Sequence, residues 1–203
     1  MKSYPSITTD IRADVPIFAF DKLDGSQIRV EWTKKSGFVA FGTRTRALEA
    51  SHPWLGEAIT LARDRYEAAV GRALVAGKVQ KATLYFELLG PGSFAGRHQR
   101  EPHDLVLIDV DRFGRGLIPP DEFIAVFGDL NVPRLLYRGL ADPAFVASVR
   151  DGALPGLGGE GVVCKSTVQE RRVPVMFKIK TRAWLARLRE DCGADEAMYT
   201  ALA

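Results

Sequence analysis

Short apolar runs separated by turn residues fill the first part of the chain. Their Phe, Ile, Val and Trp content is typical of β-strands. The pairs Asp24-Gly25 and Ser36-Gly37 lie between the runs and predict turns. The polar residues 1–14 are predicted to form an irregular lead-in. Three consecutive strands are therefore expected: residues 17–20, 28–32 and 38–41.

A helical pattern follows these strands. Apolar residues recur every three or four positions from Leu55 to Leu74, which predicts an amphipathic helix. Ser51 is a suitable N-cap and Pro53 would lie in the first turn, so the helix is expected to begin near Ser51. Core packing explains the apolar stripe better than a binding face does. Its members are Leu55, Ile59, Ala62, Tyr66, Val70 and Leu74.

The remainder of the chain mixes strands and helices without a strict βαβ alternation or an internal repeat. Thr181 is predicted to cap a last helix whose Trp184, Leu185 and Leu188 face inward, followed by a short polar tail. The predicted class is α+β, with mostly antiparallel sheets flanked by helices. No linker divides the chain, so one domain is expected over residues 1–203. Further strands are predicted at 83–89, 104–110, 135–137, 161–165 and 173–180, and helices at 120–127 and 143–149.

The amino-acid composition says more about the cellular compartment and the possible partners of the protein than about its activity. The 203 residues carry a formal charge of +3, which permits a nucleic-acid partner without requiring one. Cys164 and Cys192 form neither a disulfide framework nor a CxxC site, and they indicate a reducing compartment. No stretch suits a membrane span or a secretory signal, so we expect a cytoplasmic protein without a membrane partner.

Two familiar nucleotide-binding patterns are excluded. Residues 156–161 match G-x-G-x-x-G, but the β-branched residues Val162 and Val163 follow, which predicts a strand where a dinucleotide fold requires a helix. No G-x-x-x-x-G-K-[ST] sequence occurs. The three histidines, His52, His98 and His103, show no metal-ligand spacing.

The sequence Lys22-Leu23-Asp24-Gly25-Ser26-Gln27 places a lysine directly after the first predicted strand. A lysine at the end of a strand can be partly desolvated, and desolvation together with nearby cations favours the neutral, nucleophilic amine. The alternative is a surface lysine in a hairpin turn, since Asp-Gly is a common turn pair.

Other charged residues lie in or next to later predicted strands, at positions where they could bind a ligand. Glu87 lies within an apolar strand and needs a partner, either a ribose hydroxyl or a buried cation. Glu160 begins a predicted strand, where a carboxylate can hold Mg²⁺ or its waters. Lys178 and Lys180 are two apart in the last strand, so they point to the same face. They could bind one polyphosphate or simply form a solvated edge.

These motifs resemble, in order, those of the covalent nucleotidyltransferases, which include RNA ligases, DNA ligases and mRNA capping enzymes. The matching sequences are KLDGS, ELLG at Glu87, EGVVCK at Glu160 and KIK at Lys178, and KLDGS is most similar to the RNA ligases. The resemblance runs from about residue 16 to 182. It implies an ATP-grasp-like ligase adenylation fold, with Lys22 as the catalytic nucleophile and Glu160 as the metal ligand. The nucleotide-binding residues that it implies are Asp21, Leu23, Asp24, Gln27, Arg44, Glu87, Ile108, Glu160, Lys178 and Lys180.

Two of these positions depart from the family's pattern or allow a second interpretation. Ile108 occupies the place where the family has an aromatic residue stacked on the purine, and an aliphatic side chain can only sandwich a base. Arg44 could bind a phosphate or sugar with its fork of donors, or could be a solvated arginine beside Arg46.

The resemblance implies an ATP-dependent RNA ligase that forms lysyl-AMP with ATP and Mg²⁺ (or Mn²⁺), transfers AMP to a 5′-phosphate and seals it to a 3′-hydroxyl. Its partners would be the ends of nicked or broken RNA, or an RNA–DNA hybrid. A minimal DNA ligase and a nucleotide-binding module without turnover are the alternatives. Because residues 181–203 are too few for a C-terminal oligonucleotide-binding domain, we expect a partner chain, dimerisation or a structured RNA to provide the additional substrate binding. Candidate RNA contacts, each equally explained as a solvated face, are Arg97, His98, Arg100, Arg182, Arg187 and Arg189.

Overall fold

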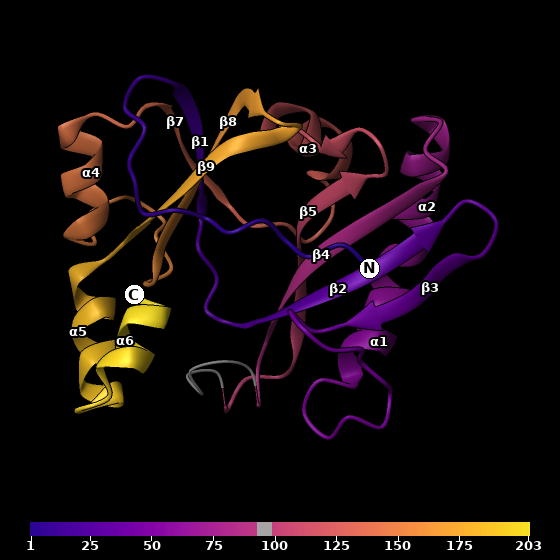
Figure 1. Ribbon diagram of the computed structural model, residues 1–203, viewed down its shortest axis with the longest axis horizontal. Helices are drawn as coiled ribbons and strands as arrows, with labels where there is room; N and C mark the ends of the chain where they lie inside the picture. Colours follow the sequence, from indigo (N-terminus) through magenta and orange to yellow (C-terminus); the bar gives the residue numbers. More distant parts are fainter. Residues whose placement is uncertain (93–98) are drawn as a thin grey trace. The chain divides into compact units, whose positions relative to one another are not determined.

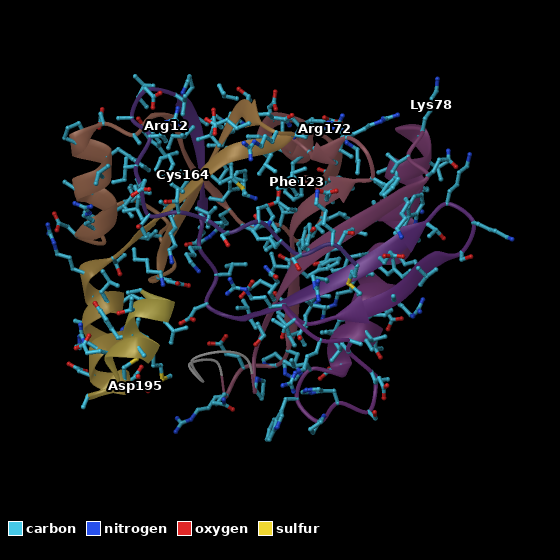
Figure 2. All side chains as sticks on the ribbon, in the orientation of Figure 1. Arg12, Lys78, Phe123, Cys164, Arg172 and Asp195 are labelled. Carbon is cyan, nitrogen blue, oxygen red and sulfur yellow. The ribbon has the colours of Figure 1, made fainter. Side chains whose placement is uncertain are left out.

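The computed structural model describes residues 1–92 and 99–203 and divides the chain into two compact units (Figure 1). The first unit contains Met1–Ser6, Asp24–Pro133 and Gln169–Pro174. The second contains Ile7–Leu23, Arg134–Val168 and Val175–Ala203. Each unit is built around its own sheet, as expected of an α+β chain with antiparallel strands. Phe123 and Cys164, labelled in Figure 2, lie in the cores of the first and second unit respectively.

The first unit contains a five-stranded antiparallel sheet of order β3-β2-β4-β5-β6. Side chains alternate between the two faces of each strand. Ile28, Val30, Leu84 and Phe86 point into the apolar core, while the intervening residues form a polar face. Of these strands, the short β6 was not predicted from the sequence. The strands are β2 (Ser26–Thr33), β3 (Gly37–Gly42), β4 (Lys81–Leu89), β5 (Asp104–Arg112) and β6 (Gly116–Leu117).

Helices cover the apolar face of this sheet. A continuous helical segment consists of α1 (Glu57–Ala62), a π-helical turn (Arg63–Glu67) and α2 (Ala68–Ala76), and α3 spans Pro120–Phe127 as predicted. The expected apolar stripe is confirmed as core, because its members from Ala62 to Leu74 are buried and Leu55 and Ile59 pack partly buried against them.

The predicted start of the first helix near Ser51 was wrong, since α1 begins at Glu57. Residues 49–56 form turns instead. The His52 Nδ1 accepts hydrogen bonds from the backbone N–H groups of Trp54 and Leu55, at 3.3 and 3.2 Å. A local side-chain acceptor therefore competes with the helical pattern that the sequence indicated.

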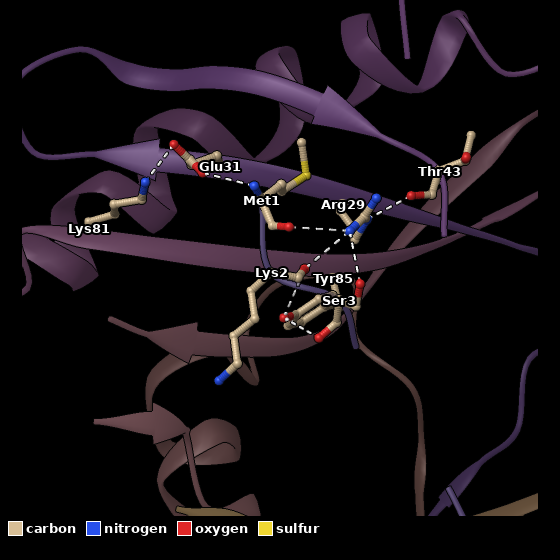
Figure 3. Close-up of polar contacts among 8 residues, drawn as sticks. All are labelled: Met1, Lys2, Ser3, Arg29, Glu31, Thr43, Lys81 and Tyr85. Atoms are coloured by element: carbon tan, nitrogen blue, oxygen red, sulfur yellow. Dashed lines mark hydrogen bonds and ion pairs between the residues drawn. The ribbon is translucent and has the colours of Figure 1, made fainter. Parts of the chain in front are cut away.

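The N-terminal residues are not a free lead-in, because they bind the polar face of the first sheet (Figure 3). Arg29, which is 7% exposed, donates to the carbonyl of Thr43 at 2.6 Å and to those of Met1 and Lys2. The Tyr85 hydroxyl donates to the Lys2 and Ser3 carbonyls. Backbone carbonyls of the segment thus satisfy buried donors of the sheet.

The second unit contains a four-stranded sheet of order β7-β1-β8-β9. Ile17, Ala19, Cys164 and Phe177 form part of its core together with residues of α4 (Pro143–Arg150). Burial raises the pKa of the Cys164 thiol to about 12, which leaves it protonated and unreactive. The strands are β1 (Pro16–Asp21), β7 (Leu135–Leu140), β8 (Gly161–Glu170) and β9 (Val173–Lys180), and residues 169–174 at the hairpin tip belong to the first unit.

Two helices follow β9. The first, α5 (Arg182–Cys192), begins as predicted at Thr181, whose hydroxyl accepts from the Trp184 N–H at 3.1 Å. The second, α6 (Glu196–Leu202), was not predicted and forms within the short tail with Asp195 as its N-cap. Among the described residues, no helix combines the length and apolar character that crossing a membrane requires.

Candidate active site

Lys22 lies immediately after β1 and contacts a buried carboxylate. Its backbone N–H donates to the Gly161 carbonyl at 2.9 Å, and its Nζ lies 2.9 Å from the Oε1 of Glu160. The Lys22 side chain is 23% exposed and that of Glu160 is 4% exposed. The amine is therefore accessible but held, unlike a surface lysine in a hairpin turn.

Gly161 explains how Glu160 reaches the two lysines. A Cβ at position 161 would lie 2.1 Å from the Ile179 carbonyl oxygen and 2.8 Å from the Lys180 Cα. The φ of +147° is also one that glycine tolerates best. Only glycine allows β8 to begin this close to the end of β9, so the Glu-Gly pair has a steric basis.

Lys180 shares the same carboxylate oxygen. Its Nζ lies 3.1 Å from the Glu160 Oε1 and 3.8 Å from the centroid of the Trp184 ring, and it also donates to the Leu202 carbonyl. Burial lowers the pKa of Lys180 to about 8. The Glu160 carboxylate opposes this effect, whereas the positive charges of Lys22 and Lys178 reinforce it.

Lys178 and Lys180 point to one face of β9, as the spacing predicted. Val175, Phe177 and Ile179, which alternate with the lysines along the strand, are in the core of the second unit. The two lysines therefore lie on the opposite face. Three ammonium groups and one carboxylate therefore gather in the second unit. This excess of positive charge suits an anionic ligand such as a polyphosphate.

Asp21 has its carboxylate engaged within the second unit. One oxygen accepts from the Gly158 N–H at 2.8 Å, and the other lies 2.9 Å from the Arg134 guanidinium. Asp21 is 5% exposed. Its carboxylate holds the loop that leads to Glu160, and its assignment to the nucleotide stays a prediction.

Gly25 brings the chain against Glu87 in the first unit. The Gly25 N–H donates to the Glu87 Oε1 at 3.1 Å. A Cβ on Gly25 would lie 2.4 Å from the Leu88 carbonyl oxygen, so the glycine of Lys-x-Asp-Gly is needed for this approach. Glu87 is therefore hydrogen-bonded to the residue three positions after Lys22.

Gln27 lies directly opposite Glu87 in the pairing of β2 with β4. Its carboxamide oxygen is buried and has no hydrogen-bond partner among the residues that the structure describes. A buried acceptor without a partner is costly unless a ligand or water supplies a donor. Glu87 and Gln27 thus form adjacent acceptors on the polar face of the sheet.

Ile108 is the extra residue of a β-bulge. Tyr85 pairs with Asp109 and Phe86 with Leu107, which leaves Ile108 out of the register. A bulge redirects its side chain from the strand's regular alternation. The neighbouring Asp109 is 2% exposed and accepts from the Tyr4 hydroxyl.

The other predicted binding residues are less constrained. Arg44 is exposed in a turn closed by the Thr43 N–H and the Arg46 carbonyl at 2.9 Å. Leu23 and Asp24 are half-buried, and the boundary between the two units falls between them. The nucleotide-binding roles of all three stay predictions.

The predicted RNA-binding cations differ in their surroundings. Arg97 and His98 lie outside the described residues, and Arg100 is exposed. Arg182 forms an ion pair with Asp151, and Arg189 forms one with Glu196. Arg187 is exposed beside Gly159.

Two further residues, which contact Phe20 and Lys180, were not assigned a role from the sequence. Lys165 is 5% exposed, with its Nζ 5.2 Å from the centroid of the Phe20 ring. It ends the EGVVCK motif, so its position was visible, but its burial was not. Trp184, which contacts Lys180, was predicted only as a core residue.

The donor set suits a metal held mainly by its substrate. Within residues 1–92 and 99–203, no group of three or more His, Cys, Asp or Glu side chains is arranged to hold a metal ion. Glu160 provides a single carboxylate. Mg²⁺ is commonly held by one or two carboxylates together with substrate phosphates and waters. A single Glu160 is therefore compatible with a divalent ion that arrives with a nucleotide.

The fold, with two sheets flanked by helices and Lys22 placed directly after β1, is shared with solved structures of an RNA ligase. The chain is similar to an RNA ligase of Naegleria gruberi. Its structure with PPi gives a TM-score of 0.68 at 16% identity, over 94% of this chain and 60% of that one.

Further structures of the Naegleria gruberi enzyme agree. A variant without ligand gives a TM-score of 0.67 at 17% identity, over 92% of this chain and 59% of that one. A variant with ATP and Mn gives 0.64 at 17% identity, over 85% and 51%. The chain thus spans about three fifths or less of the length of these ligases. No protein-family model and no curated protein matches the chain.

Proposed function

We propose that this chain is an ATP-dependent RNA ligase whose residues 1–203 form one nucleotidyltransferase domain. The observation that carries the proposal is the position of Lys22 at the end of β1, with its Nζ 2.9 Å from Glu160 in a cluster that includes Lys180. The shared fold supports it, because the similar structures are RNA ligases, among them forms with ATP and Mn and with AMP and Mn.

In the first proposed step, the Lys22 Nζ attacks the α-phosphorus of ATP. A nitrogen–phosphorus bond forms, the bond between the α-phosphorus and the bridging oxygen breaks, and pyrophosphate leaves. The attacking amine must be neutral. The charges of Lys178 and Lys180 stabilise the negative charge on the leaving pyrophosphate.

The proposed cofactor is Mg²⁺ or Mn²⁺, which would neutralise charge on the polyphosphate, and Glu160 is the residue proposed to hold it. Glu87 and Gln27 are the proposed acceptors for the ribose hydroxyls. This role would give the buried Gln27 oxygen the donor that it lacks within the described chain. Ile108 is proposed to contact the base by apolar packing alone.

In the later steps, a 5′-phosphate oxygen of RNA attacks the same phosphorus and releases the Lys22 amine. The 3′-hydroxyl of a second end then attacks the 5′-phosphate, a phosphodiester forms and AMP leaves. The proposed partners are therefore RNA ends.

The decisive experiment is self-labelling with α-labelled ATP and Mg²⁺, followed by a denaturing gel. We expect covalent label on the wild type and none on Lys22→Ala. Lys35→Ala, which alters an exposed lysine in the turn before β3, is the matched control and should label normally. An unlabelled wild type, or equal label on Lys22→Ala, would refute the proposal.

A second measurement tests RNA against DNA as substrate. Nicked duplexes that differ only in whether the 3′-hydroxyl strand is RNA or DNA should be sealed at different rates. We expect faster sealing with RNA at the 3′ end. Equal or faster sealing with DNA would favour a minimal DNA ligase of the same chemistry.

A further inference from the structure

Trp54 is largely exposed in a loop that is held by several hydrogen bonds. Its relative exposure is 58%, whereas Trp32 and Trp184 are each 2% exposed. An exposed tryptophan loses the benefit of burying a large apolar surface, so its ring is available to a ligand. Trp54 takes no part in the cores of the described residues.

The ring is held from one side by the loop after β4. A Cβ on Gly92, whose φ is +73°, would lie 2.7 Å from the Trp54 Cβ and 2.9 Å from its Cε3. Glycine at position 92 therefore lets the backbone pack directly against the indole. Because His52 also accepts from the Trp54 N–H, both the backbone and the ring are positioned before any ligand binds.

His103 fixes the other side of this contact. Its Nδ1 lies 2.6 Å from the Glu57 carboxylate and its Nε2 lies 2.6 Å from the Pro91 carbonyl oxygen. These contacts join the start of α1 to the residue before Gly92. An aromatic platform that is already ordered binds with a smaller entropic cost than a mobile one.

Trp54 lies at the end of the first sheet that carries Glu87. Gly92 is five residues beyond Glu87, so the chain between them can span at most about 18 Å. Phe113, which is 77% exposed and is the other strongly exposed aromatic residue among those described, lies at the opposite end of β4, where its N–H donates to the Lys81 carbonyl. Of these two exposed residues, Trp54 is the one that lies against the segment following Glu87.

The same loop between β3 and α1 exposes positive charge. Arg44 and Arg46 are exposed in its first turn, against one acidic residue, Glu49. An aromatic face and arginines exposed in one loop are the combination that binds single-stranded nucleic acid, since bases stack on the ring and phosphates pair with the cations.

We propose that Trp54 is a stacking platform for a base of the RNA strand, with Arg44 and Arg46 contacting the adjacent backbone; for Arg44 this role replaces the nucleotide contact that the resemblance implied. This inference rests on the proposed RNA ligase function. It identifies a site in the first unit that would bind the RNA substrate.

Fluorescence of the full chain tests the platform, because Trp54 is its one exposed tryptophan. We expect a short single-stranded RNA to quench the emission, and an abasic strand of equal length to leave it unchanged. Trp54→Ala should bind RNA about tenfold more weakly, in line with the loss of one stacked base, and Trp54→Phe should restore most of the affinity.

Phe113→Ala is the matched control, since it removes an exposed aromatic ring from a basic turn at the far end of β4. It should bind RNA like the wild type. Self-labelling with α-labelled ATP should be unchanged in Trp54→Ala, because the residue is not in the nucleotide-binding machinery.

The platform is refuted by unquenched wild type, by undiminished RNA affinity in Trp54→Ala, or by an equal loss in Phe113→Ala. Lost AMP labelling in Trp54→Ala would also refute it, because Trp54 would then serve the nucleotide. A wild type that labels with AMP but is not quenched overturns the platform alone. A wild type that does not label overturns the proposed ligase instead.

Discussion

Glu160 is the residue on which the second unit's charge arrangement depends. One of its oxygens lies within 3.1 Å of both Lys22 and Lys180, and its side chain is 4% exposed. We expect Glu160→Gln to lower the free energy of unfolding by about 3 kcal/mol, since it leaves a buried ammonium group without its counter-charge. Chemical denaturation measures this change, and AMP labelling should be lost in parallel.

The double variant Glu160→Gln with Lys180→Met is the control for that prediction. If the cost comes from the unpaired charge, removing the charge should recover part of the stability. A double variant that is destabilised by the full sum of the two single changes would contradict the coupling.

Lys180 should also make stability depend on pH. Its pKa of about 8 in the folded chain is below the value of about 10.4 expected in the unfolded chain. Between these values the unfolded chain binds more protons, so the free energy of unfolding rises with pH in this window. From about pH 7 to 9.5 the gain should be about 2 kcal/mol relative to Lys180→Met.

Urea denaturation of both proteins across that range measures the difference. Because other groups titrate in both chains, the informative quantity is the wild type minus the variant. A difference that stays constant with pH would show that Lys180 is not held in the surroundings described above.

At the scale of elements, the stability of the first sheet depends on the N-terminal segment, Met1–Ser6. Tyr4 donates its hydroxyl to the buried Asp109, and its ring packs edge-on against Tyr85 at 4.8 Å between centroids. Burial, and then the negative charge of Asp109, raises the pKa of Tyr4 well above its usual value, so the hydroxyl remains a donor at neutral pH.

We expect Tyr4→Phe to cost about 2 kcal/mol of stability, because a buried carboxylate loses a donor while the ring packing is kept. Thermal unfolding followed by circular dichroism provides the measurement. Tyr137→Phe, which removes an exposed hydroxyl contact to the Leu140 carbonyl, should change stability by less than about 0.5 kcal/mol. Equal effects of the two changes would rule out the proposed role of the N-terminal segment.

Most elements were predictable from sequence, and the exceptions have physical causes. Apolar runs and turn residues identified β1 to β5, β7 to β9 and α3 to α5. The start of α1 was displaced because His52 binds the backbone N–H groups that a helix from Ser51 would have used. The two-residue β6 and the C-terminal α6 carry too little apolar pattern to stand out, and α6 depends on the Asp195 cap.

At the scale of the whole molecule, the modest charge of +3 limits how strongly RNA can be held by charge alone. If about three phosphates of a single strand are contacted, the logarithm of the binding constant should fall with a slope of about −2 against the logarithm of salt concentration. RNA affinity should then fall about fifteenfold between about 50 and 200 mM salt.

Fluorescence titrations at several salt concentrations measure that slope. Arg44→Ala should make it shallower by about 0.7, the contribution of one phosphate contact. A slope near zero would mean that the basic residues do not meet the RNA backbone.

The sequence by itself determined the order of elements and the identity of the reactive groups, because strand periodicity and motif spacing are local properties. It placed Lys22 after a strand, Glu160 before one, and Lys178 and Lys180 on one face. Only the tertiary structure decided that Glu160 bridges Lys22 and Lys180, that Asp21 is occupied by Arg134 and Gly158, and that Tyr4 covers Asp109. These contacts join residues distant along the chain, and burial sets their strength, so no local pattern could reveal them.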